Sequence, residues 1–97
     1  MAKIYLIESN TDGFIAYKIG KTSRKVKKRL KEIATGNAGK LSVIFEFESQ
    51  NVNELEKTLH RQFKQYHHRG EWFNDELNIS KFIDACNIYE KAIKSIK

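Results

Sequence analysis

The sequence predicts a small α+β protein with a three-stranded antiparallel sheet flanked by helices, in the order strand, strand, helix, strand, helix, helix. Two observations predict it. Runs of β-branched and aromatic residues lie on both sides of an early turn cluster. Later segments carry apolar residues at helical spacing. A length of 97 residues supports a single domain over residues 1–97.

The first two elements are predicted to form an antiparallel hairpin. Residues 3–8 are rich in β-branched and aromatic side chains, which favour a strand. Turn-forming residues fill positions 9–13. Residues 14–20 then predict a second strand, which ends at Gly20.

A helix and a third strand are expected next. Ser23 is a candidate N-cap for a helix that runs to about Ala34, and the segment 36–39 (Gly-Asn-Ala-Gly) ends it. Apolar residues at alternate positions from 41 to 47 predict a strand with one buried face. The apolar stripe of the helix consists of Val26, Leu30 and Ile33.

The second half of the chain predicts two further helices. The first begins at Asn51 or Asn53 and is broken by residues 67–70. Residues 71–73 form a short apolar docking segment, and a last helix runs over about 79–96. The stripe of the first of these helices is Val52, Leu55, Leu59, Phe63 and Tyr66.

Charge and composition indicate the class of partner. The net charge is +6 and the pI is about 9.5, which favours a polyanion, most often nucleic acid, over a basic housekeeping or membrane-facing surface. Cys86 is the only cysteine, so an internal disulfide and a Cys-rich zinc finger are excluded. No apolar run approaches a membrane span and the N-terminus lacks a signal-peptide pattern, so we expect an intracellular protein without a membrane partner.

Five short motifs occur in a defined order along these elements. They are Ile4-Tyr5, Tyr17-Lys18-Ile19-Gly20-Lys21-Thr22, Arg29-Leu30, the segment 54–63 and Gly70-Glu71-Trp72-Phe73. Together they resemble the GIY-YIG endonuclease superfamily, and in particular a small phage- and virus-associated branch with a Y-K-I-G-K-T second motif. The resemblance covers residues 3 to about 73, with the helix over 79–96 as support. Lys3 stands where the family has its first glycine, and Lys18 where it has its second tyrosine.

The resemblance implies a metal-dependent endonuclease that hydrolyses DNA phosphodiester bonds with Mg²⁺ or Mn²⁺. Tyr5 would be the general base, and the ammonium of Lys18 on the neighbouring strand would lower its pKa. Arg29 would neutralise the phosphate, and Glu56 would hold the metal. Three residues are second-tier candidates for this site: Tyr17, Lys21 and His60.

Helical phase supports two of these assignments. Arg29 lies about 60–70° from the centre of its apolar stripe, so it borders the buried face, while Lys28 points outward. Glu56 lies roughly 60° from the centre of its stripe and Glu54 roughly 140°, so Glu54 faces water and Glu56 lies at the edge of the packed face, a position from which it can face a cleft. The alternatives are an Arg29 that covers the core edge and a Glu56 in an ordinary surface ion pair.

Strand alternation and neighbouring motifs limit other interpretations. Tyr17 and Lys18 point to opposite faces, so only one can share the face of Tyr5. Adjacent histidines point in different directions, so His67-His68 is not expected to chelate a metal. Trp72 and Phe73 are expected to anchor a loop on the core rather than to stack on a base.

A basic run on the first helix is the expected contact for the DNA backbone. Three alternatives remain open: a catalytically inactive DNA-binding module of this fold, an RNA-directed module, and a protein-interaction module. The short length also fits a nuclease that relies on a targeting partner. The basic run that is expected to contact the DNA backbone consists of Arg24, Lys25, Lys27, Lys28 and Lys31.

Overall fold

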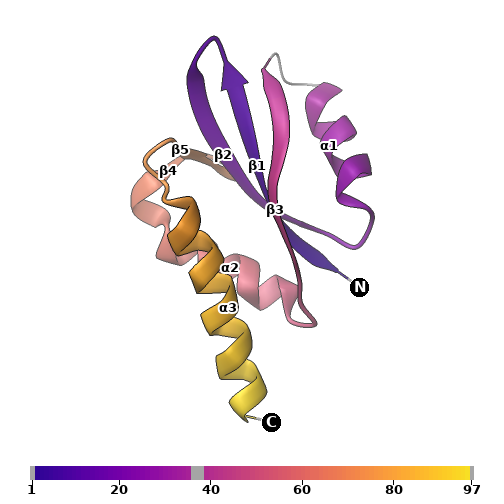
Figure 1. The fold of residues 1–97 in the computed structure, drawn as a ribbon, viewed down its shortest axis with the longest axis vertical. Coiled ribbons are helices and arrows are strands. Elements are labelled where there is room, and N and C mark those ends of the chain that lie inside the picture. The colour runs from indigo at the N-terminus through magenta and orange to yellow at the C-terminus, as the bar shows by residue number, and fades with distance from the viewer. Residues whose placement is uncertain (1, 36–38, 97) are drawn as a thin grey trace.

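The computed structural model describes residues 2–35 and 39–96, and its central element is an antiparallel sheet (Figure 1). The strands lie in the order β3-β1-β2-β5-β4. The α+β class is therefore confirmed. Along the chain the elements are β1 (Lys3–Thr11), β2 (Phe14–Thr22), α1 (Val26–Thr35), β3 (Lys40–Glu48), α2 (Val52–Gln62), η1 (Lys64–Tyr66), β4 (His67–Arg69), β5 (Trp72–Asn74) and α3 (Ile79–Ile96).

The prediction of a three-stranded sheet is wrong, because residues 67–74 add a second hairpin. β4 and β5 pair around a turn in which Gly70 has a φ of 58°, a conformation that favours glycine. Strands of three residues are too short to carry a readable alternation. The sequence therefore predicted only a helix break at 67–70 and a docking segment at 71–73. α2 ends at Gln62, before Tyr66 of its predicted apolar stripe. The short 3₁₀ helix η1 follows and leads into the hairpin.

The β1–β2 hairpin is confirmed and is longer than predicted. Its register runs from Lys3↔Thr22 to Thr11↔Phe14. Only Asp12 and Gly13 remain for the turn, with φ values of 53° and 90°. Two consecutive residues with positive φ are what a two-residue type I′ hairpin requires, and Asp-Gly is a preferred pair for it. The side chain of Asn10 also accepts a hydrogen bond from the Gly13 amide at 2.9 Å.

The first helix begins at Val26, two residues later than a cap at Ser23 predicts. Ser23 lies in the loop before α1, where the hydroxyl of Thr22 accepts a hydrogen bond from the Arg24 amide at 3.0 Å. The helical residues are Val26–Thr35. Of the predicted stop signal at 36–39, residues 36–38 lie outside the described residues.

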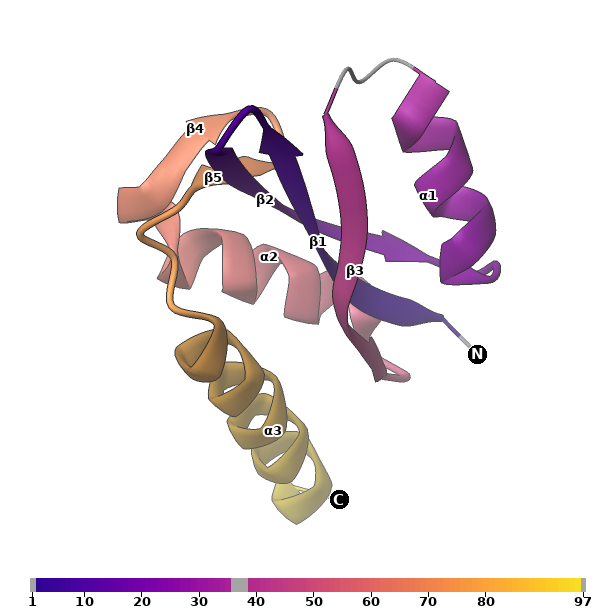
Figure 2. The same cartoon turned by 45° about the horizontal axis from the view of Figure 1, so that its top comes forward.

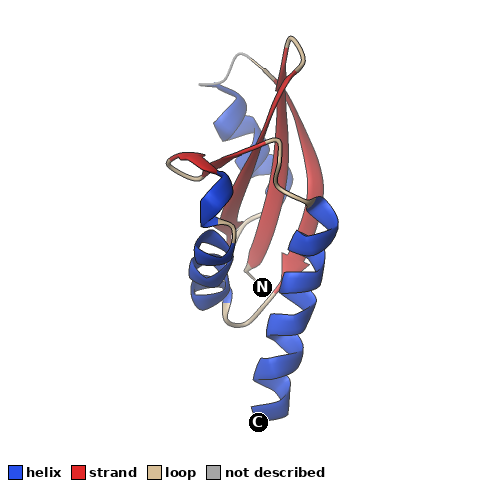
Figure 3. Cartoon of the chain, turned by 90° about the vertical axis from the view of Figure 1, so that its left-hand side faces the viewer, coloured by secondary structure: helices blue, strands red, loops and turns tan. Residues whose placement is uncertain are grey.

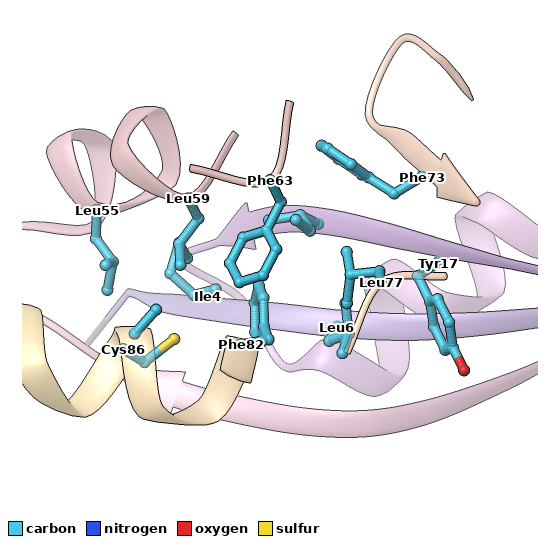
Figure 4. Close-up of a cluster of buried hydrophobic side chains, with 12 residues drawn as sticks. Ile4, Leu6, Tyr17, Leu55, Leu59, Phe63, Phe73, Leu77, Phe82 and Cys86 are labelled. Atoms are coloured by element: carbon cyan, nitrogen blue, oxygen red, sulfur yellow. The ribbon is translucent and has the colours of Figure 1, made fainter. Parts of the chain in front are cut away.

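Strand alternation divides the core between the two faces of the sheet. Ile4 and Leu6 point to the face where they pack with α2 and α3, and Figure 4 shows this cluster. Tyr5 and Ile7 point to the other face and pack with Val26 of α1. Figure 3 shows α1 and α3 on opposite sides of the sheet. A residue of β1 therefore belongs to the α1 side or to the α2–α3 side according to its parity.

Candidate active site

Tyr5 lies at the centre of the candidate site, on the α1 side of the sheet. Its side chain is 1% exposed. The ring crosses over Gly20, its register partner on β2. A Cβ atom at position 20 would collide with the phenol oxygen and the end of the Tyr5 ring. The glycine therefore creates the space in which the Tyr5 ring lies.

Arg29 of α1 is the basic residue that contacts this phenol. Its Nε donates a long hydrogen bond of 3.4 Å to the Tyr5 hydroxyl oxygen. Its Nη1 lies 3.8 Å from a carboxylate oxygen of Glu32, one helical turn away. The Arg29 side chain is 36% exposed, so it joins the buried phenol to the solvent. This is the border position that helical phase predicted for it.

The electrostatics of Tyr5 differ from the sequence prediction. Burial raises the pKa of Tyr5 above its ordinary value of 10.0, and the hydrogen bond and positive charge of Arg29 oppose this rise. The sequence pattern predicted that Lys18 would lower the pKa. Lys18 does point to the Tyr5 face, but its ammonium is 2.7 Å from Oε1 of Glu71. Arg29 thus has the role expected of Lys18, and the prediction for Lys18 is wrong in this respect.

The edge of β2 that faces away from β1 forms hydrogen bonds to different groups along its length beside this site. β5 pairs with β2 only from Ala16 to Lys18. At the next residue, the Ile19 amide donates to the backbone oxygen of Glu71 at 3.1 Å. The Ile19 carbonyl lies 3.0 Å from Nε2 of His60. Because a carbonyl only accepts, His60 must carry its proton on Nε2. His60 therefore holds α2 against the edge of β2.

Glu56 lies one helical turn before His60 and faces the same edge. It is close enough to Tyr5 for its charge to contribute to the raised pKa of that phenol, as Glu71 also does. Its Oε1 lies 3.4 Å from the ammonium of Lys21. Its Oε2 is buried and has no hydrogen-bond partner in the part of the chain that the structure describes. Glu54, by contrast, is 69% exposed, as its helical phase predicted.

The unpartnered oxygen provides a test of the predicted metal. A buried carboxylate oxygen without a donor is costly unless something positive binds it. Among residues 2–35 and 39–96, no three His, Cys, Asp or Glu side chains gather as a metal cage. Mg²⁺ commonly binds through one or two carboxylates and completes its shell with water and substrate phosphate oxygens. Glu56 therefore fits a site of this kind and does not fit an all-protein cage.

The second-tier candidates separate in space. Tyr17 packs in the core on the α2–α3 side, opposite Tyr5. Burial raises its pKa, and the charges of Glu8 and Asp75 add to this effect. Lys21 lies near Glu56 and also donates to Oδ1 of Asn53 at 2.8 Å. Lys21 and His60 thus belong to the surroundings of Glu56, and Tyr17 does not.

The basic run forms an exposed surface beside the site. Arg24 pairs with Glu32, with Nη2 2.9 Å from Oε2. A pocket of about 460 Å³ opens between the start of α1 and the start of α2, and Arg29, Lys21 and Asn53 line part of it. Four exposed lysines of this basic run make no ion pair with the residues that the structure describes: Lys25, Lys27, Lys28 and Lys31.

Glu71 is a residue of this site that the sequence analysis did not assign. It follows Gly70 in the β4–β5 turn, and its backbone and side chain bind Ile19 and Lys18 respectively. Glu71 lies within the motif Gly70-Glu71-Trp72-Phe73, for which the sequence predicts a role only for the two aromatic residues. The sequence does contain a signal for Glu71 as a site residue, because it is a glutamate next to a turn glycine and within one of the five motifs. Its partner Lys18 lies 53 positions away, and no local pattern reveals that contact.

The fold and the side chains together define a class: a small α+β protein with a polar site where Tyr5, Arg29 and Glu56 gather at the edge of β2. Residues 2–94 match the T5orf172 domain, and the chain belongs to this family. The domain occurs in phage and bacterial nuclease-like proteins, and it is compatible with a nuclease-like or DNA-binding role. No curated protein and no solved structure matches the chain. None of the helices in the described residues has the length and apolar character that a membrane span needs.

Proposed function

We propose that the chain is a metal-dependent endonuclease of the GIY-YIG type that hydrolyses DNA phosphodiester bonds. The observation that carries the proposal is the contact between Arg29 and the Tyr5 phenol beside a buried, unpartnered oxygen of Glu56. Hydrolysis needs a proton acceptor for water, positive charge at the phosphate and a means to stabilise the leaving oxygen. Tyr5 of β1 and Arg29 of α1 supply the first two requirements, and Glu56 of α2 would hold the metal that supplies the third.

Tyr5 accepts the proton of the attacking water in this proposal. Its raised pKa means that the phenol is neutral at pH 7, so only a small fraction is phenolate, and Arg29 favours that fraction. Tyr5 is also nearly inaccessible, with Arg29 in contact with its oxygen. A water reaches this oxygen only when the Arg29 side chain shifts, and a bound phosphate provides the reason for that shift.

Glu56 would hold the metal, and Lys21 pairs with its carboxylate in the absence of substrate. Mg²⁺ or Mn²⁺ held there would supply positive charge to the scissile phosphate and to the oxygen that leaves. Lys18 is a positioning residue, because it fixes the side chain of Glu71. The exposed lysines of α1 attract the DNA backbone without reading its sequence.

Plasmid nicking in Mg²⁺ or Mn²⁺ tests the proposal. Glu56→Gln should lower the nicking rate about 100-fold or more, because it removes the metal-binding charge and keeps the shape. Glu54→Gln is a matched control on the same helix and should leave the rate unchanged, since Glu54 is 69% exposed. Nicking by Glu56→Gln at the rate of the unmodified protein would remove Glu56 from the mechanism.

A second candidate is a DNA-binding module of the same fold without catalysis. Two observations favour it: the ammonium of Lys21 already neutralises Glu56, and Lys3 replaces the first glycine of the GIY-YIG motif. It predicts salt-sensitive binding of duplex DNA and no nicking with either metal. The same plasmid assay, run beside a binding titration, distinguishes the two candidates.

A further inference from the structure

Part of the Tyr5 face of the sheet is open. α1 packs over β3 and β1, and in the described residues no helix covers β2, β5 and β4 on that face (Figures 1 and 2). Lys18 and Trp72 are partly exposed there, and Arg69 is exposed. The open area continues directly from the site around Tyr5.

Three side chains form a row across this open area. Lys18 is the register partner of Trp72, and Trp72 is the register partner of Arg69. Residues directly opposite each other in neighbouring antiparallel strands share one face. The row that contains Tyr5 and Gly20 lies two residues along β2, which corresponds to about 7 Å. The two rows are therefore neighbours on one surface.

The structure separates the two aromatic residues of the last motif. Phe73 is 0% exposed and belongs to the core on the α2–α3 side. Trp72 points to the open face, where the ammonium of Lys18 lies 5.6 Å from its ring centroid. The expectation that both residues anchor a loop on the core therefore holds for Phe73 and not for Trp72.

Trp72 also lines a hollow of about 210 Å³ on this face. The hollow is bounded by Trp72, Arg69, His68, Ala16, Ser9 and Thr11. It thus combines an indole ring, a guanidinium, an imidazole and small polar side chains. Throughout residues 2–35 and 39–96, neither Arg69 nor His68 makes an ion pair. Glu71, an acidic group that adjoins this row, is already paired with Lys18.

We propose that this hollow binds one unpaired nucleotide of a DNA strand, with the base stacked on Trp72 and its phosphate bound by Arg69. Aromatic rings beside basic groups are the usual means of holding single-stranded nucleic acid, because every base has a face that stacks. The strand then continues over the neighbouring row toward Tyr5 and Arg29. This inference rests on the proposed function, since it assigns the substrate an unpaired nucleotide on the same face as the cleaved bond.

The fluorescence of Trp72 tests the inference without catalysis. Trp72 is the only tryptophan of the chain, so its emission reports this hollow alone. A short oligothymidylate added in the presence of a chelator should quench the emission in a saturable way. Arg69→Gln should raise the apparent Kd about tenfold by this readout. Arg61→Gln, an exposed arginine of α2, is the matched control and should leave the Kd unchanged.

A second pair of variants separates stacking from a structural role. With a dye-labelled oligothymidylate, Trp72→Leu should raise the Kd roughly fivefold or more, the effect of losing one stacked base. Trp72→Phe keeps a stacking ring and should restore most of the affinity, provided that both variants keep the circular dichroism spectrum of the unmodified protein. Quenching without plasmid nicking supports the hollow and contradicts only the proposed function. Nicking with no quenching, or an RNA oligomer that binds more tightly than DNA, overturns the inference.

Discussion

At the scale of single residues, the site depends on contacts that a sequence shows only in part. Helical phase was enough to place Arg29 and Glu56 at borders of their packed faces, and strand parity limited the face of Tyr5 to one of Tyr17 and Lys18. They were not enough to find which cation meets the Tyr5 phenol, because Lys18 and Arg29 both suit that position in sequence. The difference comes from Glu71, whose Oε1 lies 2.7 Å from the ammonium of Lys18 and leaves Arg29 as the cation at the phenol. The sequence also could not show that Oε2 of Glu56 lacks a hydrogen-bond partner, because this depends on where every neighbouring donor points.

The raised pKa of Tyr5 predicts how nicking depends on pH. Below the folded pKa, which lies above 10.0, each pH unit increases the phenolate fraction about tenfold. If the phenolate accepts the proton, the nicking rate should rise with pH from 7 to about 9 with a slope near one on logarithmic axes. Initial rates measured in Mg²⁺ and in Mn²⁺ give the profile. A flat profile over this range contradicts the role of Tyr5 as the base.

At the scale of elements, the long strands and amphipathic helices were predictable and the short hairpin was not. β1, β2 and β3 each have nine residues, long enough for composition and alternation to show. β4 and β5 have three residues each and exist because they pair with each other and with β2. Their pairing is a tertiary effect, so local propensity predicts a break and a docking segment instead. The same hairpin supplies Glu71 to the site and Trp72 to the hollow on the open face.

His60 connects two of these elements, and its loss should affect stability and activity. His60→Ala leaves the Ile19 carbonyl without its donor, which should cost about 1–3 kcal/mol of unfolding free energy. It should also lower nicking, because α2 positions Glu56. Urea unfolding and the plasmid assay give the two values, with Arg61→Ala as an exposed neighbour for comparison. Equal unfolding free energies for the two variants would contradict the contact assigned to His60.

At the scale of the whole molecule, the core is buried on both faces of the sheet and excludes charge. Cys86 of α3 is 0% exposed, and burial raises its pKa from 9.0 to about 12. The thiol therefore stays neutral in the folded chain at pH values where the unfolded chain ionises it. Its contribution to stability is complete below pH 9 and is lost as the pH rises from 9 to 12.

This buried thiol predicts an alkaline loss of stability that depends on one residue. Between pH 9 and 12, the unfolding free energy should fall by up to about 1.4 kcal/mol per pH unit because of Cys86 alone. Cys86→Ala should be less stable at pH 7, since it leaves a cavity, yet its curve should fall less steeply above pH 9. Buried tyrosines add to the slope equally in both proteins. Parallel curves from urea unfolding at each pH would contradict the burial of an ionisable thiol.

The central claim is that Tyr5, Arg29 and Glu56 act as a single site, and a double-mutant cycle on nicking tests it most directly. Residues that act as a unit show strongly non-additive losses. The rate of the Tyr5→Phe/Glu56→Gln double variant should therefore match that of the worse single variant. Losses that multiply in the double variant, or single variants as active as the unmodified protein, would contradict a shared site.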